Sequence, residues 1–75
     1  MTIGELANIL STMFHKAPRA EKASMILLFG IRYGEIIQKK KYSVKEIVQL
    51  ANLPTSYQNG ITKGIKLAAY VVEKK

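Results

Sequence analysis

Five polar side chains near the C-terminus recur at the spacing of one helix face. They are the amides Gln58 and Asn59, the hydroxyl Thr62 and the ammonium groups Lys63 and Lys66. Residues three or four apart lie on the same side of an α-helix. Amides pair with adenine, ammonium groups bind guanine or phosphate, and hydroxyls bind either. The pattern indicates hydrogen bonding to base edges and to the phosphates beside them.

Residues that could catalyse a reaction or hold a metal are sparse. The chain has a single histidine, His15, no cysteine, and only glutamates among its five acidic residues. Catalytic triads and metal sites need several such groups in one place. The four glycines spaced in pairs, 30 with 34 and 60 with 64, lie inside helical patterns rather than before a helix, unlike a phosphate-binding loop. We therefore expect no enzyme, no metal, no cofactor and no small-molecule ligand.

The charge favours a polyanionic partner. Twelve Lys and Arg residues against five Glu give a formal net charge of +7, which attracts nucleic acid or an anionic membrane at long range. The longest apolar run, residues 25–31, has seven residues, whereas a membrane-spanning helix needs about 20. The N-terminus lacks the basic start and cleavage site of a secretory signal. We expect a cytoplasmic protein that binds nucleic acid and not a membrane.

The sequence predicts a single all-α domain over residues 1–75, with four helices at about 3–16, 18–39, 43–52 and 56–72. The first and third helices begin with capping boxes, Thr2 with Glu5 and Ser43 with Glu46. Pro18 suits the first turn of the second helix.

The third and fourth helices are separated by a short turn. Asn52 tolerates the left-handed conformation that closes a helix, and Pro54 prevents the helix from continuing. Thr55 or Ser56 is then expected to cap the fourth helix. Tyr57 and Ile61 begin the apolar side of that helix, opposite its polar residues.

The second helix is apolar over more than half of its circumference, which is typical of a central helix or of one shared with another molecule. Gly30 and Gly34 within it, and Gly60 and Gly64 in the last helix, each cost about 1 kcal/mol relative to alanine. We expect these small residues to let the two helices cross closely in one core, with contact between two copies of the chain as the alternative.

Residues 43–72 resemble the helix-turn-helix motif of DNA-binding domains. In that motif a small or turn-forming residue between the helices is followed by an apolar residue, and further apolar residues anchor the second helix. Asn52, Leu53, Tyr57 and Ile61 match this plan. The sequence departs from it in having Asn52 where glycine is usual, and Gln58 at the usual apolar anchor, so that Tyr57 must take the anchoring role. No strand hairpin follows to form a wing.

The resemblance implies that the fourth helix lies in the major groove of double-stranded DNA, and that the chain is a small transcriptional regulator or the DNA-binding module of a larger system. The four side chains nearest the bases would be those of Gln58, Asn59, Thr62 and Lys63. The remaining predicted DNA-binding residues, facing the backbone, are Ser56, Lys66, Tyr70, Lys39, Lys40, Lys41 and Lys45.

A protein interaction module is the alternative function, with the lysines serving only solubility. Its surface would be the apolar face of the second helix, through Met25, Leu28, Phe29 and Ile36. The same face could join two copies of the chain, since helix-turn-helix proteins commonly pair to match two-fold operators. We expect a homodimer.

Overall fold

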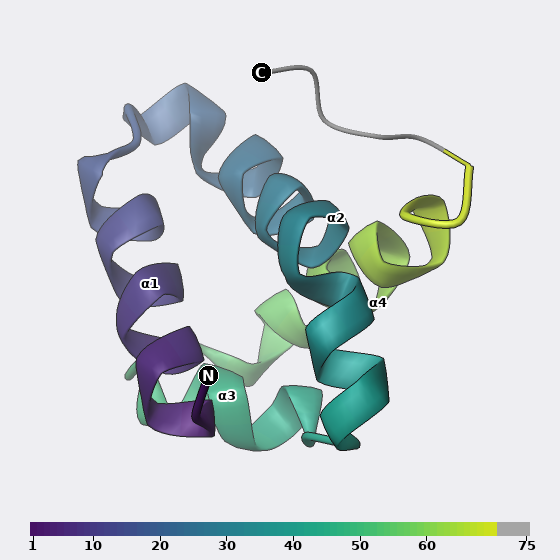
Figure 1. Ribbon diagram of the computed structural model, residues 1–75. Helices are drawn as coiled ribbons and strands as arrows, with labels where there is room; N and C mark the ends of the chain where they lie inside the picture. The colour runs from purple at the N-terminus through teal and green to yellow at the C-terminus, as the bar shows by residue number, and fades with distance from the viewer. Residues whose placement is uncertain (71–75) are drawn as a thin grey trace.

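The computed structural model describes residues 1–70 of the chain. They form four α-helices and no strand, so the predicted all-α fold is confirmed (Figure 1). The helices are α1 (Ile3–Lys16), α2 (Lys22–Lys40), α3 (Val44–Leu50) and α4 (Gln58–Leu67), and two short 3-10 turns, η1 (Arg19–Glu21) and η2 (Thr55–Tyr57), precede α2 and α4.

The predicted starts of α1 and α3 are confirmed by their caps. Thr2 Oγ1 accepts a hydrogen bond from the Glu5 N–H at 3.1 Å, and the Thr2 N–H donates to Glu5 Oε1 at 2.9 Å. At α3, Ser43 Oγ accepts from the Glu46 N–H at 3.3 Å. These bonds satisfy N–H groups that have no partner within a helix's first turn. The bounds of α1 are those the sequence predicts.

The second helix begins four residues later than predicted, at Lys22 instead of Pro18. The Glu21 N–H donates to the Pro18 carbonyl at 2.8 Å and closes the tight turn η1. Glu21 then adopts φ −111° and ψ 5°, outside α-helical geometry. The continuous helix therefore starts at the next residue.

The fourth helix is shorter than the predicted range 56–72. Neither Thr55 nor Ser56 caps it: both lie in η2, and α4 has no side-chain cap. Beyond Leu67 the chain tightens into turns, and the Tyr70 N–H donates to the Leu67 carbonyl at 2.8 Å. Tyr70 is 86% exposed, so its side chain gains little packing that would favour a longer helix. Residues 71 and 72 lie outside the described part of the chain.

The turn after α3 has the backbone that the sequence predicts. Asn52 adopts φ 61°, in the left-handed region. The Leu53 N–H donates to the Val48 carbonyl at 3.1 Å and the Asn52 N–H to the Gln49 carbonyl at 3.0 Å, while Val48 and Leu53 are both buried. This is a Schellman motif with its apolar contact. It ends α3 at Leu50, two residues earlier than predicted, and turns the chain toward α4.

The end of α2 repeats this motif at an unexpected residue. Lys41 adopts φ 57°, and the Tyr42 N–H donates to the Ile37 carbonyl at 3.0 Å. Lysine is uncommon in the left-handed region, so the sequence does not signal this turn. It directs the chain from α2 into α3.

The core takes side chains from all four helices, and its tightest packing is between α2 and α4. A Cβ atom on Gly30 would collide with the Ile61 carbonyl oxygen and lie 2.9 Å from the Gly64 Cα. A Cβ atom on Gly64 would collide with the Leu27 carbonyl oxygen. The two helices therefore touch backbone to backbone, which confirms the expected crossing of glycines within one core and fixes α4 against α2.

Candidate nucleic-acid interface

The fourth helix separates apolar from polar residues as the sequence predicts. Ile61, Gly64 and Ile65 are buried, and Ile61 is wholly inaccessible to solvent. The exposed residues of the helix include Asn59, Thr62, Lys63 and Lys66. Because Gly64 packs its backbone directly on α2, these four side chains form a polar face that points away from that crossing.

The other residues near α4 that are predicted to bind DNA lie at or beyond the ends of the helix. Gln58 is half-buried at the start of the helix, and Ser56 is exposed in η2. Tyr70 is exposed but lies past the end of α4, in the turn formed by residues 68–70. Its place is therefore set by that turn rather than by the helical spacing that groups the other residues.

The start of α4 is anchored to α1 by an aromatic contact. The rings of Phe14 and Tyr57 pack edge to face, with centroids 5.1 Å apart and an interplanar angle of 66°. Phe14 is buried and Tyr57 is half-buried against the core. Tyr57 thus occupies the anchoring role for which Gln58 is unsuited, and it places the first turn of α4 beside the C-terminal end of α1.

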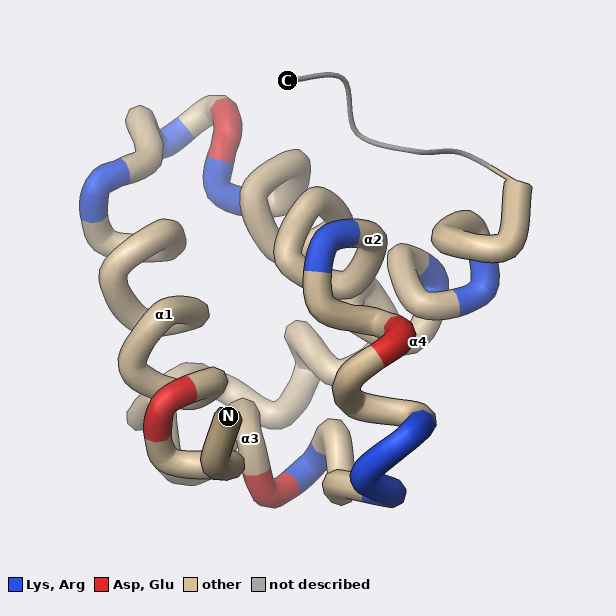
Figure 2. The backbone as a smooth tube through the Cα atoms, in the orientation of Figure 1, with Lys and Arg blue, Asp and Glu red and all other residues tan. Residues whose placement is uncertain are grey.

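Four lysines lie where α2 ends and α3 begins, and all four are exposed. We call Lys39, Lys40 and Lys41 the basic run. Lys39 and Lys40 end α2, Lys41 forms the left-handed turn, and Lys45 lies in the first turn of α3. Figure 2 shows this basic run where α2 meets α3, with the lysines of α4 on a separate part of the surface. The run lies at the entry to the helix-turn-helix segment in three dimensions as well as in the sequence.

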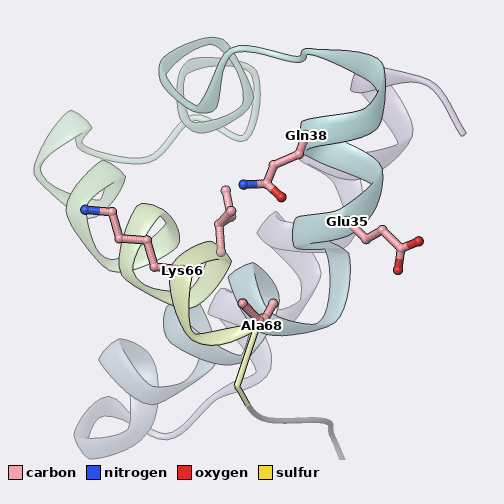
Figure 3. A pocket seen from close by; sticks show the side chains of 6 residues that line it. Glu35, Gln38, Lys66 and Ala68 are labelled. Carbon is pink, nitrogen blue, oxygen red and sulfur yellow. The ribbon is translucent and has the colours of Figure 1, made fainter.

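A pocket lies between the C-terminal part of α2 and the end of α4. It has a volume of about 260 Å³ and is lined by Glu35 and Gln38 of α2 and by Ile65, Lys66, Ala68 and Ala69. In Figure 3, Gln38 points across the pocket toward α4, whereas Glu35 and Lys66 point outward on opposite sides. The pocket therefore brings Gln38 of α2 close to Lys66 of the polar face of α4. Helical spacing gives no signal for Gln38, because its proximity to α4 arises from tertiary packing.

Phe29 is predicted to lie in an interface on α2, and the structure shows that this is wrong. Phe29 is fully buried, with 0% of its side chain exposed, and its ring lies 5.3 Å from that of Tyr33. It belongs to the core because the opposing helices close over it, and it offers no surface to a partner. Ile36 is half-buried and packs against the core as well. Met25 and Leu28 are half-buried.

Residues 2–74 match the model of a known protein family, the HTH-like domain. The chain belongs to the HTH-like domain family. This confirms the helix-turn-helix resemblance, and it extends the assignment from residues 43–72 to nearly the whole chain. Membership of the family points to DNA binding in general. Comparisons with curated proteins and with solved structures gave no match.

Metal-binding clusters and membrane-spanning helices are both absent from residues 1–70 of this HTH-like domain. Residues 1–70 hold no group of three or more His, Cys, Asp or Glu side chains arranged to bind a metal ion. Nor does any helix among them have the length and hydropathy required to cross a bilayer.

Proposed function

We propose that this HTH-like domain binds double-stranded DNA with α4 in the major groove, acting as a small transcriptional regulator or as the DNA-binding module of a larger system. The observation that carries the proposal is the exposed face of Asn59, Thr62, Lys63 and Lys66, held at a fixed orientation by the glycine crossing beneath it. These residue types match the donors and acceptors displayed by base edges and phosphates.

Within this proposal Gln58, Asn59, Thr62 and Lys63 lie nearest the bases, as expected for the N-terminal half of a recognition helix. Lys66, Ser56 and Tyr70 approach the backbone. The basic run of Lys39, Lys40 and Lys41, together with Lys45, neutralises phosphates beside the groove.

A salt series of binding to random-sequence duplex DNA tests the proposal. If the protein neutralises about five phosphates, log K against log salt concentration has a slope of about −4.5 or steeper, since each contact contributes roughly −0.9. Replacing Lys63 and Lys66 together by Glu should abolish retention of the duplex. Circular dichroism should show the same helicity before and after, because both side chains are exposed.

The matched control is the pair Lys63→Arg and Lys66→Arg, which keeps both charges and should keep the salt slope. A slope near zero for the unaltered protein would contradict DNA binding, and binding that survives the double Glu variant would contradict α4 as the reading helix. If DNA is ignored throughout and a protein partner is lost when Leu28 becomes Asp, the interaction module is the function. Leu28 is suited to this test because it is half-buried, whereas an aspartate at the fully buried Phe29 would unfold the domain.

A further inference from the structure

A second group of basic side chains lies at the corner where α1 turns into α2. Lys16 ends α1, Arg19 lies in η1 and Lys22 begins α2. Lys16 and Arg19 are exposed, and Lys22 is half-buried. Figure 2 shows these basic segments gathered at the corner, at the opposite end of α2 from the basic run that leads into α3. We call Lys16, Arg19 and Lys22 the corner cluster.

The corner cluster is joined to the start of α4 through one aromatic ring. Lys22 Nζ lies 4.4 Å from the centroid of the Phe14 ring and donates a hydrogen bond to the Phe14 carbonyl oxygen at 2.7 Å. The same ring packs against Tyr57, the residue before α4. The ammonium group of Lys22 is thus occupied within the fold, whereas the neighbouring Lys16 and Arg19 extend their charges from a corner that adjoins the first turn of α4.

The packing of α4 on α2 shows which end of α4 lies nearer to the corner cluster. Gly60 lies against Ile26, since a Cβ atom added to Gly60 would lie 2.8 Å from Ile26 Cγ2. Gly64 lies against Gly30. Further along, the Cβ position of Gly34 is 3.5 Å from Ala68 Cβ. Contacts advance in the same direction on both helices. The first turn of α4 is therefore on the side of the corner cluster, and its last turn is on the side of the basic run.

The recognition helix consequently lies between two basic groups. The 19 residues of α2 span about 28 Å at 1.5 Å per residue, with the corner cluster at one end and the basic run at the other. Because α2 and α4 run in the same direction, the corner cluster lies toward the first turn of α4 and the basic run toward its last turn. A helix in the major groove, which is about 12 Å wide, has phosphates of the DNA backbone beside both of its ends. Long Lys and Arg side chains from the two ends of α2 can approach these phosphates.

We propose that Lys16 and Arg19 bind DNA phosphates beside the first turn of α4, at the opposite end of that helix from the phosphates held by Lys39, Lys40 and Lys41, with Lys22 as the positioning residue that fixes the corner. This inference rests on the proposed function. It raises the number of neutralised phosphates from about five to about seven, and it assigns DNA contacts to residues outside the helix-turn-helix segment itself.

The test uses a double variant that carries both Lys16→Gln and Arg19→Gln. Its control is a second double variant that preserves both charges, Lys16→Arg with Arg19→Lys. The glutamine pair should flatten the salt slope by about 1.8, from about −6.3 to about −4.5, and weaken binding about 60-fold at 0.1 M salt. The control pair should leave both quantities unchanged. Glu21→Gln, which removes the acidic charge of the same corner, should strengthen binding.

Two results overturn the inference in distinguishable ways. If the unaltered protein shows a steep salt slope and the glutamine pair keeps the same slope and affinity, the corner cluster does not touch DNA and the proposed function stands without it. If the unaltered protein shows no salt-dependent binding, the proposed function fails and the inference fails with it. Thermal unfolding of each variant checks that the exposed substitutions leave the fold intact.

Discussion

At the scale of single residues, the ends of the helices are determined by hydrogen bonds between neighbours in the chain. The Thr2 N–H donates to Glu5 Oε1, and Thr2 Oγ1 accepts from the Glu5 N–H. The backbone N–H of Thr2 is the main cause that lowers the pKa of the Glu5 carboxyl, followed by the Thr2 side chain. Hydrogen bonds to the ionised form favour that form, so this cap is strongest when Glu5 is charged.

Glu5 gives the domain a predictable dependence on pH. Because the pKa of Glu5 is lower in the folded chain than in the unfolded chain, the stabilisation is present above the unfolded pKa and is lost as the pH falls through the folded pKa. Glu5→Ala should lower the unfolding midpoint temperature at neutral pH, and the difference from the unaltered protein should shrink in acid. Parallel thermal unfolding curves over a pH series measure this, and a difference that stays constant down to strongly acidic pH would rule out the charged cap.

At the scale of elements, the decisive contact is the crossing of α2 and α4. Gly30 and Gly64 meet there with backbone atoms on both sides, so neither position has space for a side chain. A clash with a flexible side chain is relieved by a rotamer change, whereas a clash with backbone forces whole helices apart. The orientation of the polar face of α4 therefore depends on a residue, Gly64, that contacts no ligand.

Gly64→Ala tests this crossing. Its Cβ would collide with the Leu27 carbonyl oxygen and lie 2.9 Å from the Gly30 Cα, so the free energy of unfolding should fall by about 3 kcal/mol or more. A core of this size rarely supplies more than roughly 3 to 5 kcal/mol, so the variant should be largely unfolded. Chemical denaturation monitored by circular dichroism measures the change.

Gly4→Ala is the matched control, because the same substitution there meets no backbone. The nearest atom to the added Cβ is Thr2 Oγ1 at 3.9 Å, and Gly4 is exposed in the first turn of α1. Alanine favours helix over glycine by about 1 kcal/mol, so this variant should be as stable as the unaltered protein or more so. Equal effects of the two substitutions would show that helix propensity, and not the crossing, governs position 64.

At the scale of the whole molecule, charge and small size point to partners. A net charge of +7 on 75 residues attracts a polyanion, and a domain this small buries only about 60% of the surface of its unfolded chain. A second copy would add buried area. With Phe29 inside the core, Met25 and Leu28 are the residues of the predicted interface that remain for such contact, and two-fold pairing would suit a palindromic DNA site.

We expect the chain to form a homodimer through this part of α2. Leu28→Asp should convert it to a monomer, because an unpaired charge would be buried between the two copies. Ser24→Asp adds the same charge at an exposed position of the same helix and should leave the dimer intact. Light scattering of the three proteins measures the mass, and a monomeric mass for the unaltered protein at high concentration would exclude the dimer.

Features that depend on neighbours along the chain could be predicted from the sequence. The four helices, the caps at Thr2 and Ser43, the left-handed Asn52 and the two faces of α4 follow from spacing and from local hydrogen bonds. The exceptions are also local in origin: the tight turn after Pro18, the shortened α4 and the left-handed Lys41 are places where the backbone adopted a geometry that residue types signal only weakly.

Contacts between residues far apart in the chain became known from the packing of the helices. Phe29 proved to be a core residue and not an interface residue, since periodicity cannot tell a buried face from a shared one. The contact of Phe14 with Tyr57 joins positions more than forty apart, and it places the C-terminal end of α1 beside the start of α4. Helix spacing fixes the face on which a side chain lies, but the close packing of glycine backbones between α2 and α4 fixes where that face stands in the molecule.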